Sequence, residues 1–128
     1  MLIGEFAYDG EELAIYAVRQ RGQLAVYVED AYGDRVVDMS VRAPHLQLEW
    51  DEFVLNAALR REMVRSILST GYFEDTGRRV RHGEVIGQPV WRLAGVAARL
   101  PIEHEHDRFR GVKRTLANHG RRTGRRTW

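Results

Sequence analysis

The sequence predicts an α+β fold, in which an antiparallel β-meander sheet carries one helix packed on a face, in the order ββββ-α-ββ. Two observations predict it. Residues 2–41 alternate between apolar and polar side chains and are divided by short turn sequences, whereas residues 57–70 carry apolar side chains at helical spacing. Each kind of element has one apolar face to bury, so packing the helix on the sheet is the expected two-layer arrangement.

Four strands are expected in the first 41 residues, and they are rich in β-branched and aromatic side chains. Asp9-Gly10 and Arg21-Gly22 separate the first three strands, because glycine supplies the positive φ that a tight hairpin turn needs. A loop at 30–34 leads to the fourth. Such short connections favour antiparallel neighbours, since a parallel return takes about a dozen residues or more. The expected strands are residues 2–8, 13–19, 23–29 and 35–41.

One helix is expected at residues 57–70, after Pro44 has broken the strand pattern. Asn56 is a favourable N-cap residue, and Gly71 suits the position just beyond the C-terminus. The apolar stripe consists of Leu59, Met63, Val64, Ile67 and Leu68. The stretch before the helix is ambiguous: residues 53–55 fit a short strand, but Asp51 also fits the start of a longer helix.

Strands are expected to resume after the helix and to end before Pro101. We expect a turn at 75–77, a loop at 87–89 and a last core strand at 90–98. Pro101 then divides the chain into a core domain, residues 1–100, and a basic C-terminal tail, residues 101–128. Phe109, Val112 and Leu116 have the spacing of an amphipathic helix within that tail.

Charge is segregated along the chain. Residues 1–98 hold 11 arginines and 15 acidic residues, a net charge of −4, whereas residues 99–128 hold nine cations and three acids, a net charge of +6. Arginine forks bind phosphate oxygens in a bidentate manner, so the tail is a candidate nucleic-acid-binding arm. The alternatives are a solvated terminus and a tail that folds back on the acidic body. The candidate residues are Arg108, Arg110, Lys113, Arg114, Arg121, Arg122, Arg125 and Arg126.

Acidic side chains cluster in the body. Glu29, Asp30, Asp34 and Asp38 lie in or beside the loop at 30–34, and a second set consists of Glu49, Asp51 and Glu52. If the first four converge, they form a partner-binding surface that imitates a phosphate backbone and fits a basic groove on another protein. Loop acids that serve only solubility are the alternative.

The sequence gives little support to catalysis, metal binding or membrane insertion. The chain has no cysteine, P-loop, dinucleotide-binding glycine motif or H-E-x-x-H motif, and we expect no cofactor. The weak candidates are a metal pair at His104 and His106, and acid–base chemistry at Asp75, His82 and Glu84. Without a signal peptide or a long apolar run, we expect a cytoplasmic protein.

Four segments carry a resemblance to a known group: VYVED at 26–30, DEFV at 51–54, FEDTGRRV at 73–80 and QPVWRL at 88–93. Over residues 23–93 the chain resembles short uncharacterised proteins carried by bacterial phages and plasmids. The resemblance implies an accessory gene of a mobile element and assigns no catalytic residue. Our leading hypothesis is therefore a non-enzymatic accessory or inhibitor protein that binds a host protein or nucleoprotein complex. Nucleic-acid binding through the tail is the alternative, and a small enzyme or metal-binding protein comes third.

Overall fold

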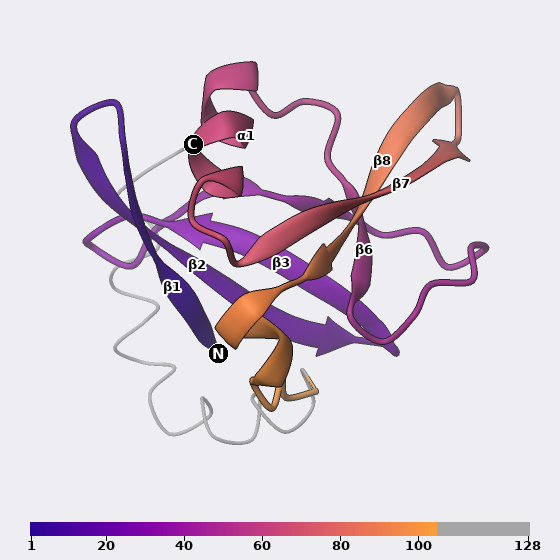
Figure 1. Ribbon diagram of the computed structural model, residues 1–128, viewed down its shortest axis with the longest axis horizontal. Coiled ribbons are helices and arrows are strands. Elements are labelled where there is room, and N and C mark those ends of the chain that lie inside the picture. The colour runs from indigo at the N-terminus through magenta and orange to yellow at the C-terminus, as the bar shows by residue number, and fades with distance from the viewer. Residues whose placement is uncertain (105–128) are drawn as a thin grey trace.

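The computed structural model describes residues 1–104, and its strands form two four-stranded antiparallel sheets (Figure 1). The first sheet has the order β1-β2-β3-β4, and the second has the order β5-β6-β8-β7. The strands are β1 (Leu2–Tyr8), β2 (Glu11–Gln20), β3 (Gln23–Glu29), β4 (Arg35–Asp38), β5 (Ser40–Val41), β6 (Glu52–Leu55), β7 (Phe73–His82) and β8 (Val85–Leu93). The described residues also form one α-helix, α1 (Arg61–Leu68), and a 3₁₀ helix at Gly95–Arg99.

The first three strands and both tight turns are confirmed. Asp9 and Gly10 have φ values of 52° and 76°, and Arg21 and Gly22 have values of 49° and 83°. Two consecutive residues of positive φ make a turn whose twist matches that of the paired strands. The turns therefore set the register of the first sheet, in which Phe6 faces Leu13 across one strand pair.

The expected fourth strand is divided between the two sheets, so the prediction of a single sheet is wrong. Met39 lies at the division: its N–H donates to the carbonyl of Val26 in β3 at 2.8 Å, and its carbonyl accepts from the N–H of Asn56 at 2.7 Å. One short segment therefore pairs with β3 on one side and continues into the sheet of β6 on the other. Met39 is fully buried at this crossing.

The helix is shorter than expected, and Asn56 is not its N-cap. The Oδ1 atom of Asn56 accepts from the N–H of Ala58 at 3.0 Å, and the N–H of Leu59 donates to the carbonyl of Asn56 at 3.3 Å. These bonds close a separate turn before the helix. Arg60 then occupies the N-cap position without a side-chain hydrogen bond. The helix also ends earlier than the expected Thr70: it ends at Leu68 with Ser69 as its C-cap, so Gly71, whose φ is 78°, lies one position beyond the C′ residue.

The expected turn at 75–77 is a bulge within the continuous strand β7. The hydroxyl of Thr76 donates to the carbonyl of Val90 at 2.7 Å, so a side chain replaces a ladder bond where the register shifts. The expected loop at 87–89 is likewise part of β8, in which Gln88 pairs with Val80 and Pro89 with Arg79. The last strand ends at Leu93 because the chain turns into the 3₁₀ helix there.

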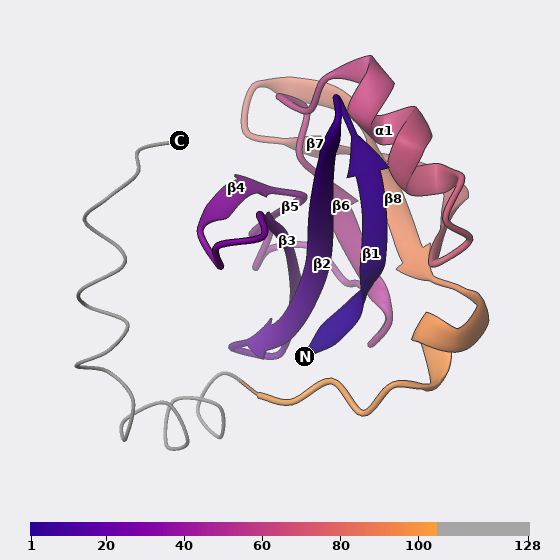
Figure 2. The same ribbon diagram turned by 90° about the vertical axis from the view of Figure 1, so that its left-hand side faces the viewer.

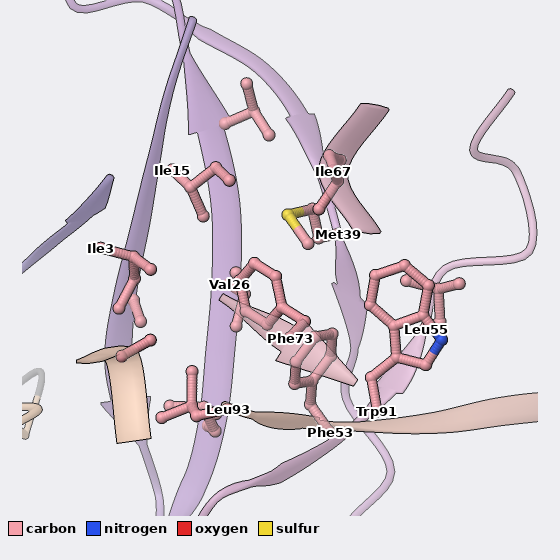
Figure 3. Packing of buried hydrophobic residues seen from close by; sticks show 14 of the residues in the cluster. Ile3, Ile15, Val26, Met39, Phe53, Leu55, Ile67, Phe73, Trp91 and Leu93 are labelled. Atoms are coloured by element: carbon pink, nitrogen blue, oxygen red, sulfur yellow. The ribbon is translucent and has the colours of Figure 1, made fainter. Parts of the chain in front are cut away.

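The main core lies between the two sheets and is closed on two sides. Helix α1 contacts β1 and β7, which are the edge strands of the two sheets, and the β4–β5 crossing joins them elsewhere (Figure 2). Phe53, Phe73 and Trp91 form a group of aromatic rings with centroids 5.7 to 6.3 Å apart. Ile67 of α1 and Met39 belong to the same buried cluster, and both lie above the aromatic rings in the view of Figure 3.

The segment after Pro101 stays against the body as far as it is described. Ile102 is buried in the main core, and the N–H of Arg19 donates to the carbonyl of Glu103 at 2.7 Å. His104 forms a parallel bridge with Arg19. The division of the chain at residue 100 stays a prediction.

Candidate functional site

The hairpin of β7 and β8 extends beyond the rest of its sheet (Figure 1). We call residues 79–89 the β7–β8 arm. Its strands pair from Arg79 and Pro89 out to His82 and Val85 near the tip. Two apolar side chains are exposed there: Val85 is 43% exposed and Ile86 is 75% exposed. The arm therefore presents branched aliphatic groups to water immediately after the Gly83-Glu84 turn that ends the hairpin.

A second, smaller core holds the base of the arm. It consists of Ala43, Val54 and Val90, and Val80 of the arm packs against it. Gln88 adds a buried hydrogen bond, in which Nε2 donates to the carbonyl of Leu55 at 3.0 Å. Leu55 is the last residue of β6, and Pro89 of the neighbouring strand β8 has no N–H to donate. The side chain of Gln88 therefore supplies a hydrogen bond between β8 and β6 at this end of their pairing. The arm is thus anchored on one side and exposed at its tip.

A polar groove of about 730 Å³ lies between the β2–β3 turn, the loop that joins β5 to β6, and Arg78 of β7, which comes just before the arm. We call it the arginine groove. Its charged lining residues are Arg21, Arg42, Arg78, Glu49 and Glu52. The groove is within the size range of ligand pockets in proteins, which is roughly 300 to 1,000 Å³.

Fixed polar contacts hold the groove's walls in place. The amide of Gln23 pairs with both backbone groups of Ala43, at 2.6 and 3.0 Å, and so attaches the loop to β3. Both terminal nitrogens of Arg78 donate to the carbonyl of Gln47 at 3.2 Å. Nη1 of Arg78 also lies 3.6 Å from Oε1 of Glu52, which accepts from the N–H of Glu49 at 2.9 Å.

Arg21 and Arg42, unlike Arg78, have no side-chain partner among the described residues. Both are exposed, and their guanidinium groups form no hydrogen bond or ion pair with any residue of the described range 1–104. Arg21 occupies the first position of the β2–β3 turn, so the backbone fixes where its side chain starts. Two cationic forks are therefore available to a ligand in a body whose net charge is negative.

An exposed aromatic residue, Trp50, is next in the chain to a residue that lines the groove, although it is not itself a lining residue. Trp50 follows the lining residue Glu49 and is 55% exposed. The guanidinium carbon of Arg19 lies 5.5 Å from the centroid of the Trp50 ring, and Nη1 of Arg19 donates to the Trp50 carbonyl at 2.7 Å. This cation–π contact orients the ring and covers one of its faces.

The four acids predicted to bind a partner are only partly available for that role. Asp30 is buried, and its Oδ1 accepts from the N–H groups of Tyr32 and Asp34, so it shapes the loop. Asp38 forms an ion pair with Arg35 at 3.2 Å. Glu29 lies at the end of β3, half-buried, in register with Arg35. A partner-binding role for Glu29, Asp30, Asp34 and Asp38 stays a prediction.

The three residues predicted for acid–base chemistry, Asp75, His82 and Glu84, have different surroundings in the structure. Asp75 forms two hydrogen bonds with Arg79, both at 2.9 Å, and this pairing holds the pKa of Asp75 below its ordinary value of 3.8. His82 stacks on His45 with ring centroids 5.8 Å apart, and Glu84 is exposed near the tip of the arm. A carboxylate with a lowered pKa is a poor proton acceptor at neutral pH.

His104 of the candidate metal pair forms a bridge with Arg19, whereas the other member of the pair and most of the basic tail lie outside the described residues. His106 and the predicted nucleic-acid-binding residues Arg108, Arg110, Lys113, Arg114, Arg121, Arg122, Arg125 and Arg126 lie outside the described residues. Within residues 1–104, no three histidine, aspartate or glutamate side chains come together as a metal site would require. The same part of the chain has no helix that combines the length and the apolar character needed to span a membrane.

Sequence reasoning missed both the groove and the arm tip. Arg21 was interpreted only as a turn residue, and Arg42 lies 36 residues from Arg78 in the chain, so no local pattern connects them. Exposed Ile86 had a weaker signal, since in the sequence it lies between Gly83 and Gly87, which were both interpreted as breaks in the strand pattern. A scan against protein-family models and searches of curated proteins and of solved structures found no significant match.

Proposed function

We propose that this chain is a non-enzymatic accessory or inhibitor protein of a mobile genetic element, which acts in the host cytoplasm by binding a host protein or nucleoprotein complex. The β7–β8 arm carries the main contact. The observation that supports this proposal is the exposure of Val85 and Ile86 at the tip of an otherwise anchored hairpin. The resemblance of residues 23–93 to phage and plasmid proteins supports the biological setting.

Burial of the arm tip in a partner supplies favourable free energy at low entropic cost. Full burial of one branched aliphatic side chain contributes about 1.5 to 3 kcal/mol, and Ile86 has three quarters of its surface still to bury. The arm is already paired and packed at its base, so binding does not have to order it. A partner with an apolar recess is therefore the expected target.

The test compares the arm tip with a matched exposed position. Val96 is 64% exposed on the 3₁₀ helix, which makes it a suitable control for Ile86 at 75%. A photo-crosslinking amino acid is introduced at position 86 or at position 96 of the full chain in the native host. Cells are irradiated, lysates are treated with nuclease, and adducts are identified by mass spectrometry. In parallel, Ile86→Ser and Val96→Ser variants are used for co-purification at moderate salt.

We expect one host protein to crosslink through position 86 and not through position 96. Ile86→Ser should reduce its recovery at least tenfold, while Val96→Ser retains it and both variants keep the melting temperature of the parent, since both sites are exposed. Equal recovery with the two serine variants would show that the arm is not the contact. Failure to recover any specific host protein would refute the proposed function as a whole.

A further inference from the structure

The arginine groove is lined by three arginines, of which Arg21 and Arg42 have no side-chain partner among residues 1–104, and its lining residue Glu49 is followed by the exposed Trp50. Residues 1–104 hold 12 arginines and 16 acidic residues, yet Arg21, Arg42 and Arg78 border one groove. We propose that this groove binds single-stranded nucleic acid, with backbone phosphates on the three arginines and a base stacked on Trp50. This site is separate from the arm tip and does not depend on the proposed function.

The arginines supply the phosphate contacts. A guanidinium group presents two parallel N–H donors that match two phosphate oxygens, and charge-assisted bonds of this kind are among the stronger ones in proteins. Arg78 is held in place by its bonds to the carbonyl of Gln47. Arg21 and Arg42 need break no contact with the described residues to turn toward a ligand. One fixed and two adjustable forks suit a chain of phosphates better than a single small anion.

The groove's carboxylates bear on this assignment in different ways. Glu52 is 9% exposed, and it already lies against Arg78 and the N–H of Glu49, so its charge is largely compensated. Glu49 is an exposed carboxylate, and its charge opposes a bound phosphate. The site should therefore bind nucleic acid with moderate affinity, and neutralising Glu49 should tighten the binding.

Trp50 favours single-stranded over double-stranded nucleic acid. Its ring is more than half exposed, and Arg19 covers one face, which leaves the other for a base. Unpaired bases stack readily on aromatic side chains, whereas a base in a duplex must first be flipped out of the helix. Stacking also tolerates any base, so the site should show little sequence preference.

The test is fluorescence anisotropy of labelled dT20, U20 and a 20-base-pair duplex with the full chain, titrated between 50 and 300 mM salt. The groove variants are Arg21→Asn with Arg42→Gln, Trp50→Ala, and Glu49→Gln; asparagine is chosen because it tolerates the positive φ of Arg21. Arg61→Gln with Arg65→Gln removes the same number of exposed cations from α1 and is the matched control. Melting curves confirm that each variant is folded.

We expect dT20 or U20 to bind at least tenfold more tightly than the duplex. The groove double variant should weaken binding at least tenfold and reduce the slope of log affinity against log salt by about 1.4, since each lost phosphate contact on a single strand accounts for about 0.7. Trp50→Ala should weaken binding about five- to twentyfold without changing that slope. Glu49→Gln should tighten it about two- to fivefold, and the α1 control should change affinity less than twofold.

Three results would overturn the assignment. Absence of oligonucleotide binding by the parent chain is the first. The second is equal affinity and equal salt slope in the groove double variant and the α1 control, which would place the binding elsewhere, for example in the basic segment 105–128. The third is competition by poly-glutamate as efficient as that by dT20, combined with no effect of Trp50→Ala, which would identify the ligand as an acidic polypeptide.

Discussion

Removal of the Ile67 side chain from α1 should be among the most costly truncations of an aliphatic residue on this helix. Ile67 is fully buried and belongs to the main core between the two sheets. Ile67→Ala deletes three carbon groups, which at roughly 0.8 kcal/mol each amounts to about 2.4 kcal/mol of transfer free energy. An unrelaxed cavity of about 50 Å³ adds about 1.2 kcal/mol at roughly 24 cal/mol per Å³. We therefore expect a loss of about 3 to 4 kcal/mol in the free energy of unfolding.

Leu68→Ala is the matched control, because it deletes the same number of carbon groups from the next residue of the same helix. Leu68 is 38% exposed, so we expect a loss of about 1 to 1.5 kcal/mol, with no enclosed cavity. Urea unfolding followed by tryptophan fluorescence and by far-ultraviolet circular dichroism measures both values, since Trp91 is buried within this core. Equal losses within 0.5 kcal/mol would refute the packing of α1 described above.

Three further predictions concern single contacts. Pairing with Arg79 lowers the pKa of Asp75, so the stability that ionised Asp75 contributes is present above pH 3.8 and is lost as the pH falls through the lowered value. Asp75→Asn should therefore reduce the stability that the protein loses on acidification, which thermal melts between pH 5 and pH 2 would detect. Gly4→Ala should cost about 1 to 3 kcal/mol, because the new methyl group meets the ring of Tyr72, and a double-mutant cycle with Tyr72→Ala should recover most of that loss. Asn56→Ala should cost about 1 kcal/mol in urea unfolding yet leave the helical circular dichroism signal unchanged, since the helix begins after the turn that Asn56 closes; a proportional loss of helical signal would contradict this.

Local rules predicted the elements whose shape depends on neighbouring residues in the chain. The turns at Asp9-Gly10 and Arg21-Gly22 need positive φ at two adjacent residues, and each pair contains a glycine, which adopts positive φ readily. The same rules failed at Asn56, where two local hydrogen-bonded structures compete for one side chain. A turn and a helix cap would both use the Oδ1 atom of Asn56 as acceptor. The backbone N–H of Asn56 also donates to the carbonyl of Met39, which is 17 residues away in the chain and therefore invisible to local rules.

The predictions of a turn at 75–77 and of a loop at 87–89 failed for a related reason. Glycine and proline are typical of turns, so residues 75–77 and 87–89 were interpreted as breaks. In the folded chain, the hydroxyl of Thr76 and the amide of Gln88 supply hydrogen bonds that the ladder lacks at these points. Such replacements depend on which strands are neighbours, and periodicity within one segment does not reveal that.

The sequence by itself determined the antiparallel strands, the single helix of the described range and the unequal distribution of charge, because these follow from side-chain alternation, helical spacing and composition. Tertiary structure decided that the strands form two sheets, since the division at Met39 rests on hydrogen bonds to residues far away in the chain. It also decided where Arg21, Arg42 and Arg78 meet. A groove is a relation between distant segments, and only their packing brings those segments together.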